Sequence, residues 1–172
     1  DSIASRLYWD GLEGHEPETI KTYLSLLEGS KVVLDVGAST GLFALLAAVG
    51  CATRQVHAFE PAPETFQYLM ENLEKNGLSN ITPVCGCLLD FDGETPLYLN
   101  HSAALPFSTS NIAGYRDAKL TLTAPAMKID TYAEINRLPA IDLIKIDVEG
   151  NDHLVLRGAK EVLEKDQPVI IC

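Results

Sequence analysis

The 172-residue chain is long enough to bury one hydrophobic core and too short for two comfortable domains, and 47% of its residues are hydrophobic. Its net charge of −11 argues against nucleic acid or an anionic membrane surface as a partner, because binding to either depends largely on cationic side chains. The sequence has neither the apolar run of roughly 18 residues that a membrane span needs nor a signal-peptide pattern, so we expect one cytoplasmic domain over residues 1–172.

The first half of the chain alternates predicted helices and strands. An amphipathic helix is expected over residues 15–30, with Pro17 at its start, as part of a helical lead-in over residues 1–30. Strand, helix, strand, helix and strand then follow at residues 31–36, 42–50, 54–60, 62–77 and 80–89. This order is typical of an α/β fold, with a parallel sheet covered by helices on both faces.

Two cysteines lie in the third of these strands. Cys85 and Cys87 alternate along it, so we expect both thiols on one face as buried, reduced, structural cysteines. A zinc site would need a second Cys or His pair at ligand spacing, and the sequence offers none.

Residues 91–140 interrupt the alternation. Residues 91–100 and 119–129 have the composition of strands and are expected to form an antiparallel pair. The polar segment between them, 101–117, is longer than an ordinary connection. We expect this insertion to lie over the active edge of the sheet and to contribute to a substrate site.

The last part of the chain returns to the first pattern. We expect an apolar fourth strand within residues 138–150, a helix over 151–167 that is interrupted at Gly158, and a fifth strand from residue 168. Because a doubly wound domain rarely ends on such a strand, we expect the natural protein to continue beyond Cys172.

The sequence DVGASTG joins the first predicted strand to the next helix. Ligands of open parallel sheets bind at the carboxyl ends of the strands, so this loop is a candidate ligand contact. Gly37 and Gly41 lie four residues apart, whereas the dinucleotide fingerprint G-x-G-x-x-G needs another spacing and a third glycine. With Asp35 two positions before the first glycine, the loop suits a ligand without a diphosphate, and we interpret it as a site for S-adenosylmethionine.

Glu60 ends the second predicted strand. A carboxylate there can accept hydrogen bonds from both ribose hydroxyls, and each such bond contributes roughly 1.5–3 kcal/mol. The alternative is a solvated acid at the end of a strand. The joint occurrence of Glu60 and the glycine loop favours the ribose role.

The chain resembles the FkbM-type methyltransferases, a family of class I S-adenosylmethionine-dependent enzymes, in the blocks LDVGASTGLFALLAA, VHAFEPAPETFQYLMENLEKNG, DGETPLYL and IDLIKIDVEGNDHLVLRGAKEVLEK. The resemblance implies a Rossmann-like fold in which Gly37 and Gly41 flank the methionine part of the cofactor. Asp35 would lie near that part, and Glu60 would hold the ribose. The complete set of expected cofactor-binding residues is Asp35, Gly37, Ala38, Ser39, Thr40, Gly41, Glu60 and Pro61. The loop departs from the family, which usually has Asn and an aliphatic residue between the glycines.

The family is associated with O-methylation of sugars and secondary metabolites. The resemblance therefore implies a methyltransferase that acts on a hydroxyl of a small molecule or a glycan. Two alternatives stay open. The first is a binding module that holds the cofactor without catalysis. The second is an NAD-dependent oxidoreductase, which the glycine spacing and the lack of an evident catalytic pair disfavour.

Candidates for a general base follow the fourth strand in the sequence IKIDVEGNDH. Asp147 ends the strand, Glu149 follows two residues later, and His153 lies within one turn of the next helix. These three groups could also bind a divalent metal such as Mg²⁺, which we do not favour.

Simpler roles exist for several of the polar residues. Asn151 or Asp152 can cap the following helix, His153 can lie on its polar face, and Lys145 can pair with a neighbouring acid. His15 and Glu16 can close over the site as a lid or can merely start the first helix.

Overall fold

The computed structural model describes residues 3–100, 108–110 and 120–172, so most of the predicted loop over 101–117 lies outside the described residues. A first sheet of five parallel strands has the order β3-β2-β1-β8-β9. Its strands are β1 (Val32–Val36), β2 (Gln55–Phe59), β3 (Ile81–Val84), β8 (Leu143–Ile146) and β9 (Val169–Ile171). The α/β prediction is confirmed.

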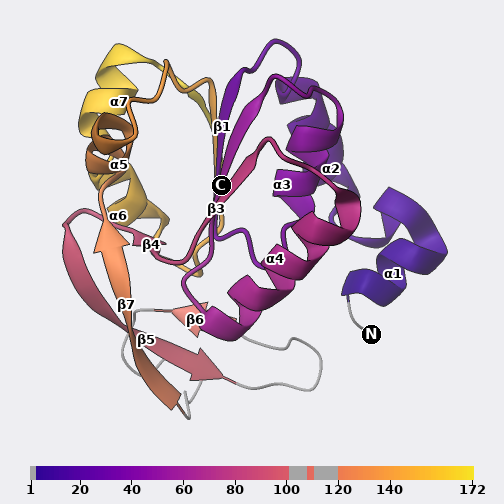
Figure 1. Cartoon of the computed structure of the whole chain (residues 1–172), viewed down its shortest axis with the longest axis horizontal. Helices are drawn as coiled ribbons and strands as arrows, with labels where there is room; N and C mark the ends of the chain where they lie inside the picture. The colour runs from indigo at the N-terminus through magenta and orange to yellow at the C-terminus, as the bar shows by residue number, and fades with distance from the viewer. Residues whose placement is uncertain (1–2, 101–107, 111–119) are drawn as a thin grey trace.

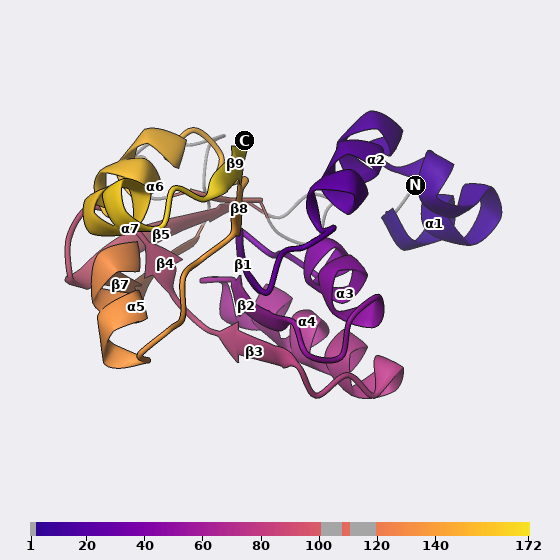
Figure 2. The same ribbon diagram turned by 90° about the horizontal axis from the view of Figure 1, so that it is seen from above.

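Helices cover both faces of this sheet (Figures 1 and 2). One face carries α2 (Pro17–Leu26), α3 (Leu42–Val49) and α4 (Pro63–Asn76), and the other carries α5 (Ile129–Ile135), α6 (Asp152–Arg157) and α7 (Lys160–Lys165). The short helices α1 (Ile3–Asp10) and η1 (Gly11–Gly14) precede α2, and α1 lies beyond it on the outside of the molecule.

The two faces explain why every residue of β1 is buried. Val33 joins the core under α2, α3 and α4, whereas Val32 and Leu34 join the core under α5, α6 and α7. Because side chains alternate along a strand, Asp35 lies on the same face as Val33. A charged residue is thereby brought into the interior directly below the loop that follows β1.

A second sheet is built from the inserted region, in the order β4-β7-β5-β6. Its strands are β4 (Cys87–Leu88), β5 (Gly93–Asn100), β6 (Ser108–Ser110) and β7 (Leu120–Met127). The predicted antiparallel pair is confirmed, because β5 and β7 pair from Gly93 opposite Ala126 to Leu99 opposite Leu120.

The prediction of one continuous strand over residues 80–89 is wrong. The chain leaves the first sheet after Val84, and β4 pairs with β7 of the second sheet instead. Cys85 is therefore exposed between two strands rather than buried, while Cys87 is half-buried. Gly86 allows this change of sheet, because a side chain there would crowd the carbonyl oxygen of Pro125 at 3.2 Å.

Other parts of the chain differ less from the prediction. The helix over 151–167 is interrupted at Gly158 as expected, and this position has no room for a side chain because a Cβ would meet the backbone carbonyl of Leu89. Helix α1 lies within the predicted helical lead-in over residues 1–30, whereas α5 was not predicted. None of the described helices has the length and apolar character needed to cross a membrane.

Candidate active site

A cavity of about 280 Å³ opens at the carboxyl ends of the first-sheet strands. The strand order reverses at β1, which has β2 on one side and β8 on the other, and such a point is the usual ligand site of an open α/β sheet. The cavity wall comes from five segments: residues 15–16, 36–43, 59–65, 86–97 and 145–151. Residues far apart in the sequence therefore meet only in the folded chain.

The glycine loop between β1 and α3 forms one wall. Gly37 has a φ of +80°, which favours glycine, and a Cβ here would meet the backbone carbonyl of Asp147. The backbone N–H groups of Gly37 and Ala38 donate to the carbonyl of Phe59 at 3.0 and 2.9 Å. The loop is thus fixed against both neighbouring strands.

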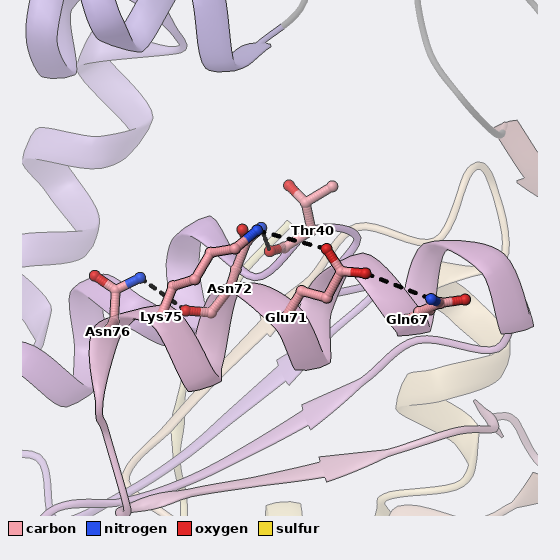
Figure 3. Close-up of polar contacts among 6 residues, drawn as sticks. All are labelled: Thr40, Gln67, Glu71, Asn72, Lys75 and Asn76. Atoms are coloured by element: carbon pink, nitrogen blue, oxygen red, sulfur yellow. Dashed lines mark hydrogen bonds and ion pairs between the residues drawn. The ribbon is translucent and has the colours of Figure 1, made fainter.

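The same loop is held from α4 by an asparagine. Asn72 Nδ2 donates to the carbonyl oxygen of Thr40 at 2.9 Å, as Figure 3 shows. One turn further along α4, Asn76 makes a bond of the same kind to Asn72 rather than to the loop (Figure 3). Gly41, with a φ of +95°, leaves room for Leu69 of α4.

Glu60 is buried in the cavity wall with both carboxylate oxygens engaged. Its Oε2 accepts a hydrogen bond from the backbone N–H of Ser39 at 3.0 Å, and its Oε1 accepts one from Ala62 at 2.9 Å. Burial raises the pKa of Glu60 to about 7, although these two N–H donors lower it. A carboxylate oxygen can accept more than one hydrogen bond, so both oxygens retain capacity for a ligand hydroxyl.

Asp35, Lys145 and Asp147 form a chain of charges below the glycine loop. Lys145 Nζ lies 3.4 Å from Asp35 Oδ1 and 3.6 Å from Asp147 Oδ2. Burial raises the pKa of the Asp35 carboxyl, and Lys145 opposes that rise. Asp35 therefore lies behind the cavity wall, and Lys145 stands between it and the cavity.

Backbone strain is concentrated at this cavity. Glu16, Ser39 and Glu149 all line it and have φ angles of +43°, +51° and +52°, in the left-handed region that side chains other than glycine rarely adopt. Such strain is typical of functional sites, where the surrounding structure imposes an unfavourable conformation.

The structure brings most of the predicted site residues together. The lining residues that were predicted are Gly37, Ala38, Ser39, Thr40, Glu60, Pro61, Asp147 and Glu149. Asp35 and Gly41 support the wall from behind. His153 is exposed on α6 and does not line the cavity. His15 and Glu16 do line it, and Glu16 makes no side-chain capping bond at the start of α2.

Sequence reasoning missed several lining residues. Phe43, Thr65, Cys87 and Leu97 reach the cavity through tertiary packing that no local pattern indicates. Lys145 was considered only as the partner of an acid; the pairing is confirmed, and its place in the wall was missed. The signal that could have found it is a lysine within an apolar strand next to the strand that carries Asp35.

The arrangement fits a nucleoside better than a metal ion. Among the described residues, no cluster of three His, Cys, Asp or Glu side chains is placed to hold a metal. Glu60 offers buried acceptors for ribose hydroxyls, and residues 37–40 of the glycine loop line the cavity beside it.

Comparison with known proteins gives one family match and several similar chains. The family described as "Methyltransferase FkbM domain" matches residues 35–172. The chain is 29% identical over 161 residues to "Hexuronic acid methyltransferase AglP" of Haloferax volcanii, a match that covers 91% of this chain and 61% of that protein. It is 28% identical over 144 residues to "Methyltransferase 1" of Beauveria bassiana, covering 73% of this chain and 57% of that protein. The chain thus spans only part of the length of both relatives.

Among solved structures, the crystal structure of "Methyltransferase FkbM" from Methylobacillus flagellatus has the same fold. It superposes with a TM-score of 0.58 at 20% identity, over 82% of this chain and 32% of that chain.

Proposed function

Because the chain belongs to the FkbM methyltransferase domain family, we propose that its cavity binds S-adenosylmethionine and that the protein methylates a hydroxyl of a small molecule or a glycan. The observation that carries this proposal is Glu60, a buried carboxylate that faces the cavity beside a glycine loop. A sugar acceptor is supported by the similarity to a protein named as a hexuronic acid methyltransferase.

The cofactor would be held by groups on the two strands nearest the point of reversal. Glu60 would accept hydrogen bonds from the ribose hydroxyls, and the backbone of residues 37–40 would lie along the methionine part. When bound, S-adenosylmethionine supplies an electrophilic methyl group.

The remaining chemistry falls to the chain's own residues. Holding acceptor and donor in line contributes about 7–11 kcal/mol to a transfer of this kind, and a general base adds about 10²–10⁴-fold. Alignment is therefore the larger contribution. Asp147 and Glu149, at the carboxyl end of β8, are the candidates to accept the proton of the acceptor hydroxyl.

Calorimetric titration tests the cofactor part of the proposal. We expect S-adenosylmethionine and S-adenosylhomocysteine to bind and NAD not to bind. Glu60→Ala should weaken binding at least about tenfold, because each hydrogen bond to a charged acceptor contributes roughly 1.5–3 kcal/mol. Glu164→Ala, at an exposed position of α7, is the matched control and should bind as the wild type does. Tight NAD binding, or full affinity in Glu60→Ala, would contradict the proposal.

Transfer itself is tested with radiolabelled S-adenosylmethionine and paired acceptors, a neutral glycoside and the corresponding uronide. Label in either acceptor supports sugar methylation. Cofactor binding without transfer to these or other hydroxyl compounds would favour a binding module without catalysis.

A further inference from the structure

Lys145 is surrounded by four groups: two carboxylates, a backbone carbonyl and an aromatic ring. Besides the carboxylates of Asp35 and Asp147, its Nζ lies 3.5 Å from the carbonyl oxygen of Gly37 and 4.7 Å from the centre of the Phe43 ring. The Lys145 side chain is only 6% exposed. In the sheet, Lys145 of β8 is the direct neighbour of Asp35 on β1.

Neutralising Asp35 is one part of what this lysine does. Asp35 is completely buried, and the Lys145 ammonium is the cation that offsets its charge, with the backbone N–H of Ala44 as a further favourable contact. Removing one partner of a buried ion pair is strongly destabilising, since the other charge stays in the interior.

The other two polar contacts point to the cavity. The Asp147 side chain is 62% exposed. Its contact with Lys145 holds this carboxylate, which is otherwise largely in solvent, beside the cavity wall. Gly37 belongs to the glycine loop. A single ammonium therefore touches the wall beside the proposed cofactor and the carboxylate beside the proposed acceptor.

We propose that Lys145 is the positioning residue of this site and sets the place of the glycine loop relative to the Asp147 carboxylate. This inference rests on the proposed function, which assigns the glycine loop to the cofactor and the Asp147 carboxylate to the acceptor. An ammonium has no lone pair to accept a proton, so Lys145 acts through Asp147 and Gly37 rather than as a base. Asp35 fixes the ammonium from behind through their ion pair at 3.4 Å.

A double substitution separates positioning from charge neutralisation. Lys145→Met leaves Asp35 buried without a cation and should lower the midpoint of thermal unfolding by about 10 °C. Adding Asp35→Asn removes that charge and should recover most of the loss. If Lys145 positions the site, the double variant still lacks the contacts to Gly37 and Asp147, whereas Asp35→Asn alone keeps them.

The first readout is amide hydrogen exchange in the glycine loop of the cofactor-free protein. The N–H groups of Gly37 and Ala38 are protected by bonds to Phe59, so displacement of the loop exposes them. We expect exchange across residues 37–40 at least about fivefold faster in the double variant than in Asp35→Asn. Lys160→Met, at an exposed position of α7, is the control for loss of a lysine and should match the wild type.

The second readout is calorimetric affinity for S-adenosylmethionine, which should be at least about tenfold weaker in the double variant than in Asp35→Asn. Equal exchange in the two variants would overturn the positioning role, and so would equal affinity where the wild type binds. A wild type that does not bind the cofactor contradicts the proposed function instead, and the exchange experiment still decides the role of Lys145.

Discussion

The carboxylate of Glu60 accepts a hydrogen bond from the backbone N–H of Ser39, 3.0 Å away, and so joins the carboxyl end of β2 to the loop that follows β1. The bond fixes an acid inside the cavity and ties it to the loop that forms the neighbouring wall. Because Ala62 donates to the second oxygen, both oxygens act as acceptors toward the protein. We therefore expect the ionisation state of Glu60 to affect the loop and, on the proposed function, the binding of a ribose.

Affinity for an adenosyl ligand is expected to rise with pH. Burial raises the pKa of Glu60 from 4.5 to about 7, so the group is largely protonated at pH 6 and largely ionised at pH 8. If only the carboxylate accepts the ribose hydroxyls, affinity increases about tenfold between these values. Calorimetry with 5′-methylthioadenosine, which has the ribose but no titrating amino acid, measures this directly. Glu60→Ala should bind weakly at both values, and a flat profile in the wild type would contradict the assignment.

Gly37→Ala should be far more destabilising than Gly29→Ala. Both glycines have similar φ angles, +80° and +84°, so an alanine is strained at either position by about 1–2 kcal/mol. Only at Gly37 does the new Cβ meet backbone, the carbonyl of Asp147, whereas Gly29 has open space. We expect a loss of about 3 kcal/mol or more for Gly37→Ala in urea unfolding. Equal losses would mean that the loop and β8 do not approach closely.

Asn72→Ala should weaken cofactor binding, and Asn76→Ala should not. Each substitution removes one amide that donates to a backbone carbonyl, at 2.9 and 2.8 Å, but only Asn72 reaches the loop through Thr40. Loss of one such bond is worth about 0.5–1.5 kcal/mol, which corresponds to about two- to twelvefold in affinity for S-adenosylmethionine if it is expressed in binding. Calorimetry on the two variants tests this, and equal affinities would show that α4 does not hold the loop.

Acid should destabilise the protein partly through His57. Its Nδ1 lies 2.9 Å from Tyr132 Oη, and burial lowers the pKa of the imidazole below 6.5. The folded protein keeps His57 neutral while the unfolded chain takes up a proton below pH 6.5, so stability present above that pH is lost as pH falls.

The loss from this one group is at most about 1.4 kcal/mol per pH unit. Urea unfolding of the wild type and of His57→Phe/Tyr132→Phe at pH 7 and pH 5.5 measures it. Contributions from other groups, including Glu60, are common to both proteins and cancel in the comparison. The same pH dependence in both would rule out His57 as the source.

The features of this fold that depend on neighbouring residues were readable from the sequence. Composition and spacing predict the buried strand β1, the glycine loop and the position of Glu60 at a strand end. The FkbM resemblance drawn from four blocks is confirmed by the family match. The interruption at Gly158 was likewise predicted.

What depends on contacts between distant segments was not readable. The alternating apolar residues around Cys87 indicate a strand but cannot say which sheet it joins, and the partner, β7, lies almost forty residues away. His153 is close to Asp147 in sequence, yet α6 carries it to the surface. Lys145 could be seen as the partner of an acid, but its contact with Gly37 arises only when β1 and β8 pair.

The second sheet begins and ends at one place. Cys87 lies opposite Ala126 and Leu88 opposite Met127, so the stretch of chain between them departs from the rest of the protein and returns to it at neighbouring points. This stretch supplies Leu88, Leu89 and Leu97 to the cavity, whereas the glycine loop and Glu60 belong to the other sheet. Because this stretch leaves and rejoins the chain at neighbouring points, its length can change without moving the glycine loop or Glu60 on the other side of the cavity.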